Sequence, residues 1–340
     1  MKAALVQPDG SLKTSEVPTP EPGPGSVLVE VAYCGICGSD VHMLDAGMMP
    51  EGSVPGHELS GRIAALGKGV EGWKEGDPVV VLPMDPCFSC EPCRQWMIAL
   101  CEGGISRAYG LGNLPGGFAQ YMLVRPSMLF RVPEGMDLKT AALNEPWAVA
   151  VHGVNLSGFK IGGHAVVMGA GPIGLLCVSA LRSAGAAGIY VSEPDAFRAG
   201  RARAMGVDAV LDPSRDSPLA VVQERIGRPP GYVFDCAGTE MSLQEAAGIA
   251  GYRGHVVALG VPMGNATMFP LQCFLRETRF SFSLGYTYPE FGDSLHLLGR
   301  GIVRPETVVS DVIPLLEIEG AMKMLHGPGH TKILMDCQAV

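Results

Sequence analysis

The chain has 340 residues, of which 47% are hydrophobic and 17% are charged, and its formal net charge is −9 at pH 7. This length leaves room for two domains, and the composition excludes an intrinsically disordered protein. The acidic balance, without a block of lysine or arginine, argues against a nucleic-acid partner. Residues 1–10 lack the apolar core of a signal peptide, and no apolar stretch is long enough to cross a bilayer, so we expect a cytoplasmic protein with no membrane partner.

The first stretch that carries chemistry follows a predicted strand over residues 27–33. It reads CGICGSDVH, from Cys34 to His42, and it is followed by Gly56-His57-Glu58. Cysteine, histidine and carboxylate are suitable zinc ligands, and three of them plus a water make a catalytic site. A histidine beside a glycine is also common as a hydrogen-bonded loop residue, so the spacing alone leaves both interpretations open.

Short predicted strands with frequent glycine turns occupy residues 59–82, and another covers 122–124, which predicts a small β-rich, barrel-like domain. Between them lie four cysteines in a C-x2-C-x2-C-x7-C pattern: Cys87, Cys90, Cys93 and Cys101. Four thiolates with no position for water suit a closed structural zinc. An iron–sulfur cluster and disulfides are the alternatives, disfavoured by the lack of a following proline and by the reducing compartment.

Residues 141–152 are predicted to form the helix that joins the two domains. Glu145 lies there among apolar residues, beside Pro146. A carboxylate near a helix start is favoured by the helix dipole, so Glu145 has a structural interpretation. Its other interpretation is a metal ligand.

Residues 164–193 carry a strand, a glycine turn, a helix, a second strand and an acid, which is the dinucleotide-binding fingerprint. The helix N-terminus offers unpaired N–H groups to a pyrophosphate. Glu193 lies where a carboxylate would accept hydrogen bonds from the adenosine ribose and repel a 2′-phosphate, so we expect NAD rather than NADP. The candidate cofactor-binding residues are Gly169, Gly171, Pro172, Ile173, Gly174, Glu193 and, one helical turn further on, Arg198.

Strands and helices continue to alternate from residue 196 to residue 260, which predicts an α/β fold with a doubly wound parallel sheet. The whole chain resembles the zinc-containing medium-chain alcohol dehydrogenases, more closely their polyol, butanediol and threonine dehydrogenase branch. The resemblance runs nearly end to end and rests on CGICGSDVH, PGHELSG, the cysteine lobe, GGFAQY, NEPWAVAVHG and VVMGAGPIGLL. It implies a Rossmann domain over residues 152–282, inserted into a β-rich GroES-like catalytic domain formed by residues 1–151 and 283–340.

The resemblance also implies the roles of individual residues. Two zinc ions per chain are expected, a structural one in the cysteine lobe and a catalytic one on Cys37 and His57. Glu58 and Glu145 share the remaining coordination in this branch, and which of them binds the resting metal stays open. The remaining implied roles belong to the segment after Cys37: Ser39 takes the substrate proton and passes it through the cofactor ribose to His42, and Asp40 orients His57.

The implied function is an NAD-dependent zinc alcohol dehydrogenase that interconverts a secondary alcohol or diol and its ketone, acting as a homo-oligomer, either tetramer or dimer. Ser283 and Leu284 replace an arginine–tyrosine pair of sorbitol dehydrogenases, and Trp147 replaces a common leucine. Both favour a small or cyclic substrate over a long sugar alcohol. The alternatives are a non-catalytic zinc protein with this fold, an NADP-preferring carbonyl reductase and a zinc-free quinone reductase, the last opposed by the cysteine lobe.

Overall fold

The computed structural model describes residues 1–339, which form two compact units. The first comprises Met1–Glu145, Thr287–Gly301 and the chain from Val309 onward, and the second comprises Pro146–Tyr286 and Ile302–Val308. Residues 302–308 therefore differ from the sequence-based assignment to the β-rich domain. The reason is local packing, since Arg201 of the second unit donates a hydrogen bond to the Glu306 carbonyl oxygen at 2.7 Å.

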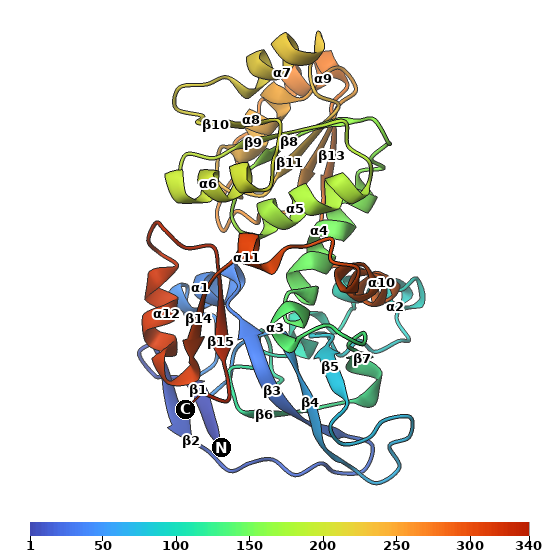
Figure 1. The fold of residues 1–340 in the computed structure, drawn as a ribbon, viewed down its shortest axis with the longest axis vertical. Helices are drawn as coiled ribbons and strands as arrows, with labels where there is room; N and C mark the ends of the chain where they lie inside the picture. Colours follow the sequence, from blue (N-terminus) through green and yellow to red (C-terminus); the bar gives the residue numbers. More distant parts are fainter. Residues whose placement is uncertain (340) are drawn as a thin grey trace. The chain divides into compact units, whose positions relative to one another are not determined.

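The first unit is built on a seven-stranded sheet with the order β14-β15-β3-β4-β5-β7, in which β6 also pairs with β3 (Figure 1). A separate pair, β1 and β2, is antiparallel. The strands are β1 (Lys2–Val6), β2 (Leu12–Glu16), β3 (Val27–Gly35), β4 (Glu58–Leu66), β5 (Pro78–Val81), β6 (Tyr121–Val124), β7 (Leu129–Arg131), β14 (Val309–Pro314) and β15 (Lys332–Asp336).

The apolar run of β3 explains its central place, since a strand with neighbours on both sides buries most of its side chains. β15 pairs antiparallel with the end of β3, Leu334 opposite Gly35, and β4 pairs with the same end, Glu58 opposite Gly35. Three segments far apart in the sequence therefore meet where β3 ends. The helices of this unit are α1 (Gly38–Asp45), α2 (Glu91–Arg94), α3 (Leu138–Ala141), α10 (Tyr288–Gly299) and α12 (Ile318–Met324).

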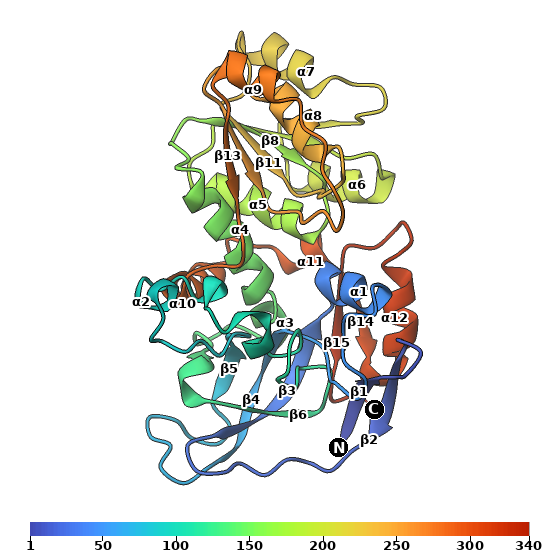
Figure 2. The same ribbon diagram turned by 180° about the vertical axis from the view of Figure 1, so that it is seen from behind.

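The second unit contains a six-stranded parallel sheet with the order β10-β9-β8-β11-β12-β13 (Figure 2). Its strands are β8 (His164–Met168), β9 (Gly188–Ser192), β10 (Ala209–Leu211), β11 (Tyr232–Asp235), β12 (His255–Ala258) and β13 (Arg279–Phe282). Its helices are α5 (Pro172–Ser183), α6 (Ala196–Ala204), α7 (Pro218–Ile226), α8 (Ser242–Ile249), α9 (Pro270–Arg276) and α11 (Pro305–Val308), while α4 (Asn144–Leu156) runs across the boundary between the units.

Helices cover both faces of this parallel sheet, which is why β8 is buried at every position after its first residue. Val166 packs in the cluster that includes residues of α7 and α8. Its neighbour Val167 points to the opposite face, where a β-carbon at Gly174 of α5 would lie 3.6 Å from it. The doubly wound sheet and the β-rich domain predicted from the sequence are both confirmed. No helix within residues 1–339 is long and apolar enough to cross a membrane.

Candidate metal and nucleotide sites

Three candidate metal ligands of the first unit come together. Cys37 is the residue before α1, His57 precedes β4, and Glu58 is the first residue of β4. One ligand atom from each lies within 4.8 Å of the others. A tetrahedral zinc with bonds of 2.0–2.3 Å would hold its ligand atoms about 3.3–3.8 Å apart, so a small contraction suits the metal. The thiol, imidazole and carboxylate that we expected from the sequence are therefore adjacent.

Asp40 contacts two of these residues. Its Oδ2 accepts a hydrogen bond from the Cys37 amide at 2.9 Å, and its Oδ1 lies 3.4 Å from His57 Nδ1. The second contact lacks hydrogen-bond geometry and leaves both buried atoms without such a partner. Burial opposes a charge on His57, but Asp40 and Cys37 outweigh it and raise the pKa of the imidazole. The side chains thus create a negative environment that suits a bound cation.

Glu58 has a further partner that our reading of the sequence missed. The ammonium of Lys332, at the start of β15, lies 2.6 Å from both Glu58 oxygens and is only 2% exposed. Burial would lower the pKa of Lys332, but Glu58, Cys37 and Glu145 raise it, so the ammonium stays charged. The only feature of the sequence that could have indicated this contact is the position of Lys332, a charged residue at the start of an apolar strand.

The remaining candidates lie on α1 and α4. Ser39 and His42 are three residues apart on α1, hence on the same side of that helix, with Ser39 half-buried and His42 exposed. Glu145 lies in the first turn of α4. It is near enough to Lys332 to act on its charge, but among the described residues it is not part of the three-residue group.

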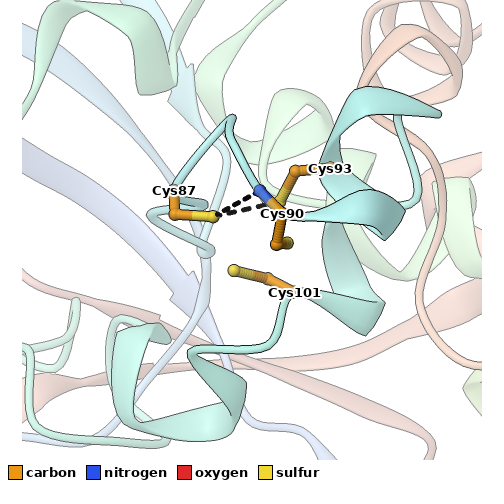
Figure 3. A group of neighbouring side chains, drawn as sticks. All are labelled: Cys87, Cys90, Cys93 and Cys101. Carbon is orange, nitrogen blue, oxygen red and sulfur yellow. Dashed lines mark hydrogen bonds between the residues drawn. The ribbon is translucent and has the colours of Figure 1, made fainter.

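The four cysteines of the predicted structural site converge on one point (Figure 3). Their ligand atoms all lie within 4.8 Å of one another, and the sulfurs of Cys87 and Cys93 are 3.9 Å apart. Hydrogen bonds from Ser89 and the Cys90 amide lower the pKa of the Cys87 thiol, whereas burial raises that of Cys93. Four sulfurs with no other ligand fit a closed zinc site.

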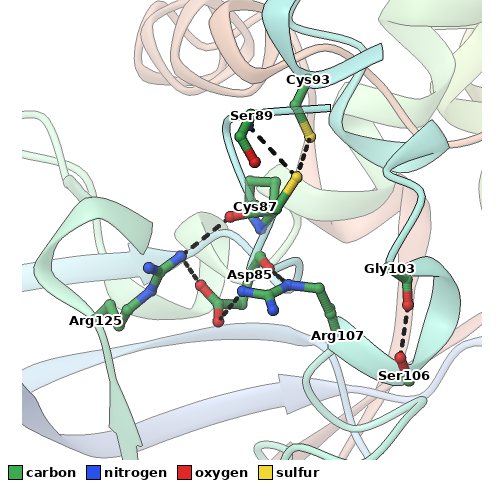
Figure 4. Close-up of polar contacts among 9 residues, drawn as sticks. Asp85, Cys87, Ser89, Cys93, Gly103, Ser106, Arg107 and Arg125 are labelled. Carbon is green, nitrogen blue, oxygen red and sulfur yellow. Dashed lines mark hydrogen bonds and ion pairs between the residues drawn. The ribbon is translucent and has the colours of Figure 1, made fainter. Parts of the chain in front are cut away.

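The chain around this lobe is anchored by a partly buried carboxylate (Figure 4). Asp85 accepts a bond from Arg107 Nη2 at 3.0 Å and also contacts the guanidinium of Arg125. Arg125 in turn donates to the Pro86 carbonyl oxygen at 3.2 Å, directly before Cys87. These contacts fix the entrance to the lobe through charge-assisted bonds, the stronger kind of hydrogen bond.

The nucleotide fingerprint of the second unit has the expected backbone. Gly169 follows β8 with a φ of +87°, a conformation that disfavours other residues. A β-carbon at Gly174 would lie 1.9 Å from the Gly169 carbonyl oxygen, so only glycine lets the helix approach the turn. Gly171 precedes α5, with Pro172, Ile173 and Gly174 in its first turn. The free N–H groups of this turn are the expected pyrophosphate contacts.

Glu193 is held in place at the end of β9. Its Oε2 accepts a hydrogen bond from the Ala170 amide at 2.6 Å, and its Oε1 accepts one from the Asp195 amide at 2.8 Å. The side chain is buried, and each oxygen keeps a lone pair for another donor. Asp195 caps α6 by accepting from the Arg198 amide at 2.8 Å, which places Arg198 in the first turn of that helix.

The residues from which we inferred substrate size differ in their burial. Trp147 is fully buried, so its ring does not line an open space in this structure. Ser283 is buried, whereas Leu284 is 57% exposed. The argument for a small substrate from the bulk of Trp147 is therefore weakened, while the loss of a cationic side chain at positions 283 and 284 remains.

Comparison with known proteins gives a consistent assignment. Residues 23–134 match the alcohol dehydrogenase GroES-like domain, and residues 172–300 match the zinc-binding dehydrogenase family. The chain is 34% identical to 2-dehydro-3-deoxy-L-galactonate 5-dehydrogenase of Pseudoalteromonas atlantica, covering 94% of this chain and 93% of that protein. It is 32% identical to (R,R)-butanediol dehydrogenase of Bacillus subtilis, covering 98% and 99%.

A zinc-binding dehydrogenase from Sinorhizobium meliloti, solved with NADP, has a TM-score of 0.91 and 30% identity over 98% of each chain. These relatives and the two matched domains show that the chain is an oxidoreductase that uses zinc and NAD(P) to interconvert an alcohol and its carbonyl compound. The chain belongs to the zinc-containing medium-chain alcohol dehydrogenase family, in the branch of the polyol and butanediol dehydrogenases.

Proposed function

We propose that the enzyme oxidises a secondary hydroxyl of a small diol, a cyclic alcohol or a short polyhydroxy compound to the ketone, and catalyses the reverse reduction. The observation that carries this proposal is the open group of Cys37, His57 and Glu58, which leaves a metal position for substrate, unlike the closed cysteine lobe. Relatives named for butanediol and for a sugar acid support a substrate with neighbouring oxygen groups. The uncharged Ser283 and Leu284 favour a short one.

Cys37 and His57 would hold a zinc ion, which would supply Lewis acidity to the substrate hydroxyl, and bound NAD(P) would supply the hydride acceptor. The chain prepares this chemistry by fixing its own ligands. Asp40 holds the Cys37 backbone and faces His57 Nδ1, which leaves Nε2 as the ring nitrogen for the metal. We assign Ser39 to accept the proton of the substrate hydroxyl and His42 to release it to water, because one is half-buried and the other exposed on the same helix.

The test is cofactor reduction at 340 nm with a panel of butane-2,3-diol, cyclohexanol, sorbitol and an open-chain sugar acid. We expect the highest kcat/KM among the small diols and cyclic alcohols, and no turnover from Cys37→Ser. Replacement of the partly buried Cys273 by serine is the matched control, because this thiol lies on α9, outside both metal groups. Highest activity with sorbitol would contradict the small-substrate proposal, and no turnover of any alcohol would contradict the whole of it.

We further propose that the enzyme is a homo-oligomer assembled through β13. This strand is at the edge of its sheet, and large apolar side chains are exposed on it and on α9: Phe274, Leu275 and Phe282. The free N–H and C=O groups of an edge strand pair readily with a second copy, and the apolar side chains favour such burial. Light scattering should show a dimer or tetramer that Phe274→Asp weakens. Ile161→Asp, at a residue that is 89% exposed outside this edge, is the control, and a monomeric wild type would contradict the proposal.

A further inference from the structure

The buried ammonium of Lys332 directly contacts Glu58, a candidate ligand of the catalytic metal. Nζ donates hydrogen bonds to the Ile36 carbonyl oxygen at 2.8 Å and to both Glu58 oxygens at 2.6 Å. These contacts use all three N–H donors. A lysine is almost never fully buried unless it is paired in this way.

The structure makes room for this contact at one specific position. Gly35 lies opposite Glu58 in the β3–β4 register, and a β-carbon there would be 2.2 Å from Glu58 Oε2. The carboxylate therefore rests over a backbone position where any other residue would displace it. Because β15 pairs with the same end of β3, Lys332 reaches the carboxylate from the other neighbouring strand. Gly35, Glu58 and Lys332 thus form a buried contact with a fixed geometry, unlike an ion pair at the surface.

The charges near the metal position explain why such a contact is useful. Cys37 as a thiolate, Asp40, Glu58 and Glu145 are four negative groups, and a zinc ion carries two positive charges. Lys332 offsets one of the two negative charges that remain. It also occupies both oxygens of Glu58, the carboxylate that lies at ligand distance from Cys37 and His57. The ammonium and the metal therefore compete for the same carboxylate.

We propose that Lys332 is a positioning residue that restrains Glu58. The catalytic metal is then bound by a weaker and more open ligand set than it would have if Glu58 coordinated it freely. This inference rests on the proposed metal site at Cys37 and His57. The restraint sacrifices metal affinity and keeps the metal electrophilic toward the substrate. Metal affinity is measured without an alcohol substrate, so this inference can fail while the proposed function stands.

The experiment measures Co²⁺ binding to enzyme whose cysteine lobe retains zinc, using the visible absorption bands of the bound cobalt. Lys332→Met keeps the length of the side chain and removes its charge. We expect the metal-free variant to melt at a lower temperature, because Glu58 loses its partner. Its Co²⁺ affinity should nevertheless rise about tenfold or more, with shifted bands and a lower kcat, since groups behind the ligands alter metal affinity on this scale. A merely structural lysine would lower both stability and affinity.

Two further variants keep the test decisive. Lys332→Arg retains the positive charge and should restore the wild-type cobalt bands and affinity. The double variant Lys332→Met/Glu58→Gln removes both partners, so it should fold even where the single variant fails. Because Lys332 acts through Glu58, the gain in Co²⁺ affinity should be absent from this variant, which should bind Co²⁺ as Glu58→Gln alone does. An affinity of Lys332→Met equal to or below wild type would overturn the proposal. A double variant that binds cobalt about tenfold more tightly than Glu58→Gln alone would also overturn it, because Lys332 would then act by its charge and not by restraining Glu58.

Discussion

Replacing Glu193 by glutamine should change the choice of cofactor, because it removes a fixed negative charge without changing the size of the side chain. In the structure both carboxylate oxygens accept backbone hydrogen bonds, from Ala170 at 2.6 Å and from Asp195 at 2.8 Å. The glutamine amide can replace only one of these acceptors with an oxygen. The substitution therefore tests the charge of Glu193 and, separately, its part in holding the glycine turn.

Each effect has an expected size. A hydrogen bond to a charged group contributes about 1.5–3 kcal/mol, so the loss of one should lower the stability of the protein by about 2 kcal/mol. Two unit charges about 5 Å apart repel by about 3 kcal/mol at an effective dielectric constant of 20. Since about 1.4 kcal/mol corresponds to a factor of ten, the preference for NAD over NADP should fall by roughly 100-fold in Glu193→Gln.

The assay compares kcat/KM for NAD and NADP at constant ionic strength, with one alcohol and both proteins. Glu224→Gln is the matched control, because Glu224 is an exposed carboxylate on α7 of the same unit and its loss changes the net charge equally. Thermal unfolding measures the structural part independently. An unchanged cofactor ratio in Glu193→Gln, or a wild-type preference for NADP, would refute the reasoning about the charge.

Three other outcomes follow from the sites. Cys93→Ser should lose zinc and lower the melting temperature, because structural metal binding is folding free energy, whereas Cys37→Ser should keep its fold and lose turnover; metal analysis that finds fewer than two zinc ions in the wild type would contradict this pair. His42→Ala should slow oxidation near neutral pH by about 100-fold or less and Ser39→Ala should slow it more, and a wild-type pH–rate profile for His42→Ala between pH 6 and 9, with chemistry rate-limiting, would exclude the relay. Burial lowers the pKa of His255, so the folded protein binds the proton of this imidazole more weakly than the unfolded chain does. The stability of the protein should therefore fall as the pH drops below about 6.5. His255→Gln should show a shallower decrease in melting temperature over this range, and equal slopes for the two proteins would disprove this.

The features that the sequence predicts well depend on short-range spacing. The glycines at 169, 171 and 174, with an apolar strand before them, specify a turn and helix start whose geometry needs no distant residue. The four cysteines between residues 87 and 101 likewise lie in one short segment, so their convergence follows from local chain reversal. His57 and Glu58 are neighbours in the chain, and the position of Cys37 was supplied by the family resemblance.

The tertiary structure decided which charged groups meet, because that depends on the pairing of strands far apart in the chain. Lys332 and Glu58 are 274 residues apart and touch only because β15 and β4 both pair with the end of β3. Asp40 could be assigned to His57 by resemblance, but its bond to the Cys37 amide appears only with the folded start of α1. The burial of Trp147 likewise depends on tertiary packing and not on the local sequence. No sequence period encodes these contacts, since each is set by the register between strands or by packing of one element on another.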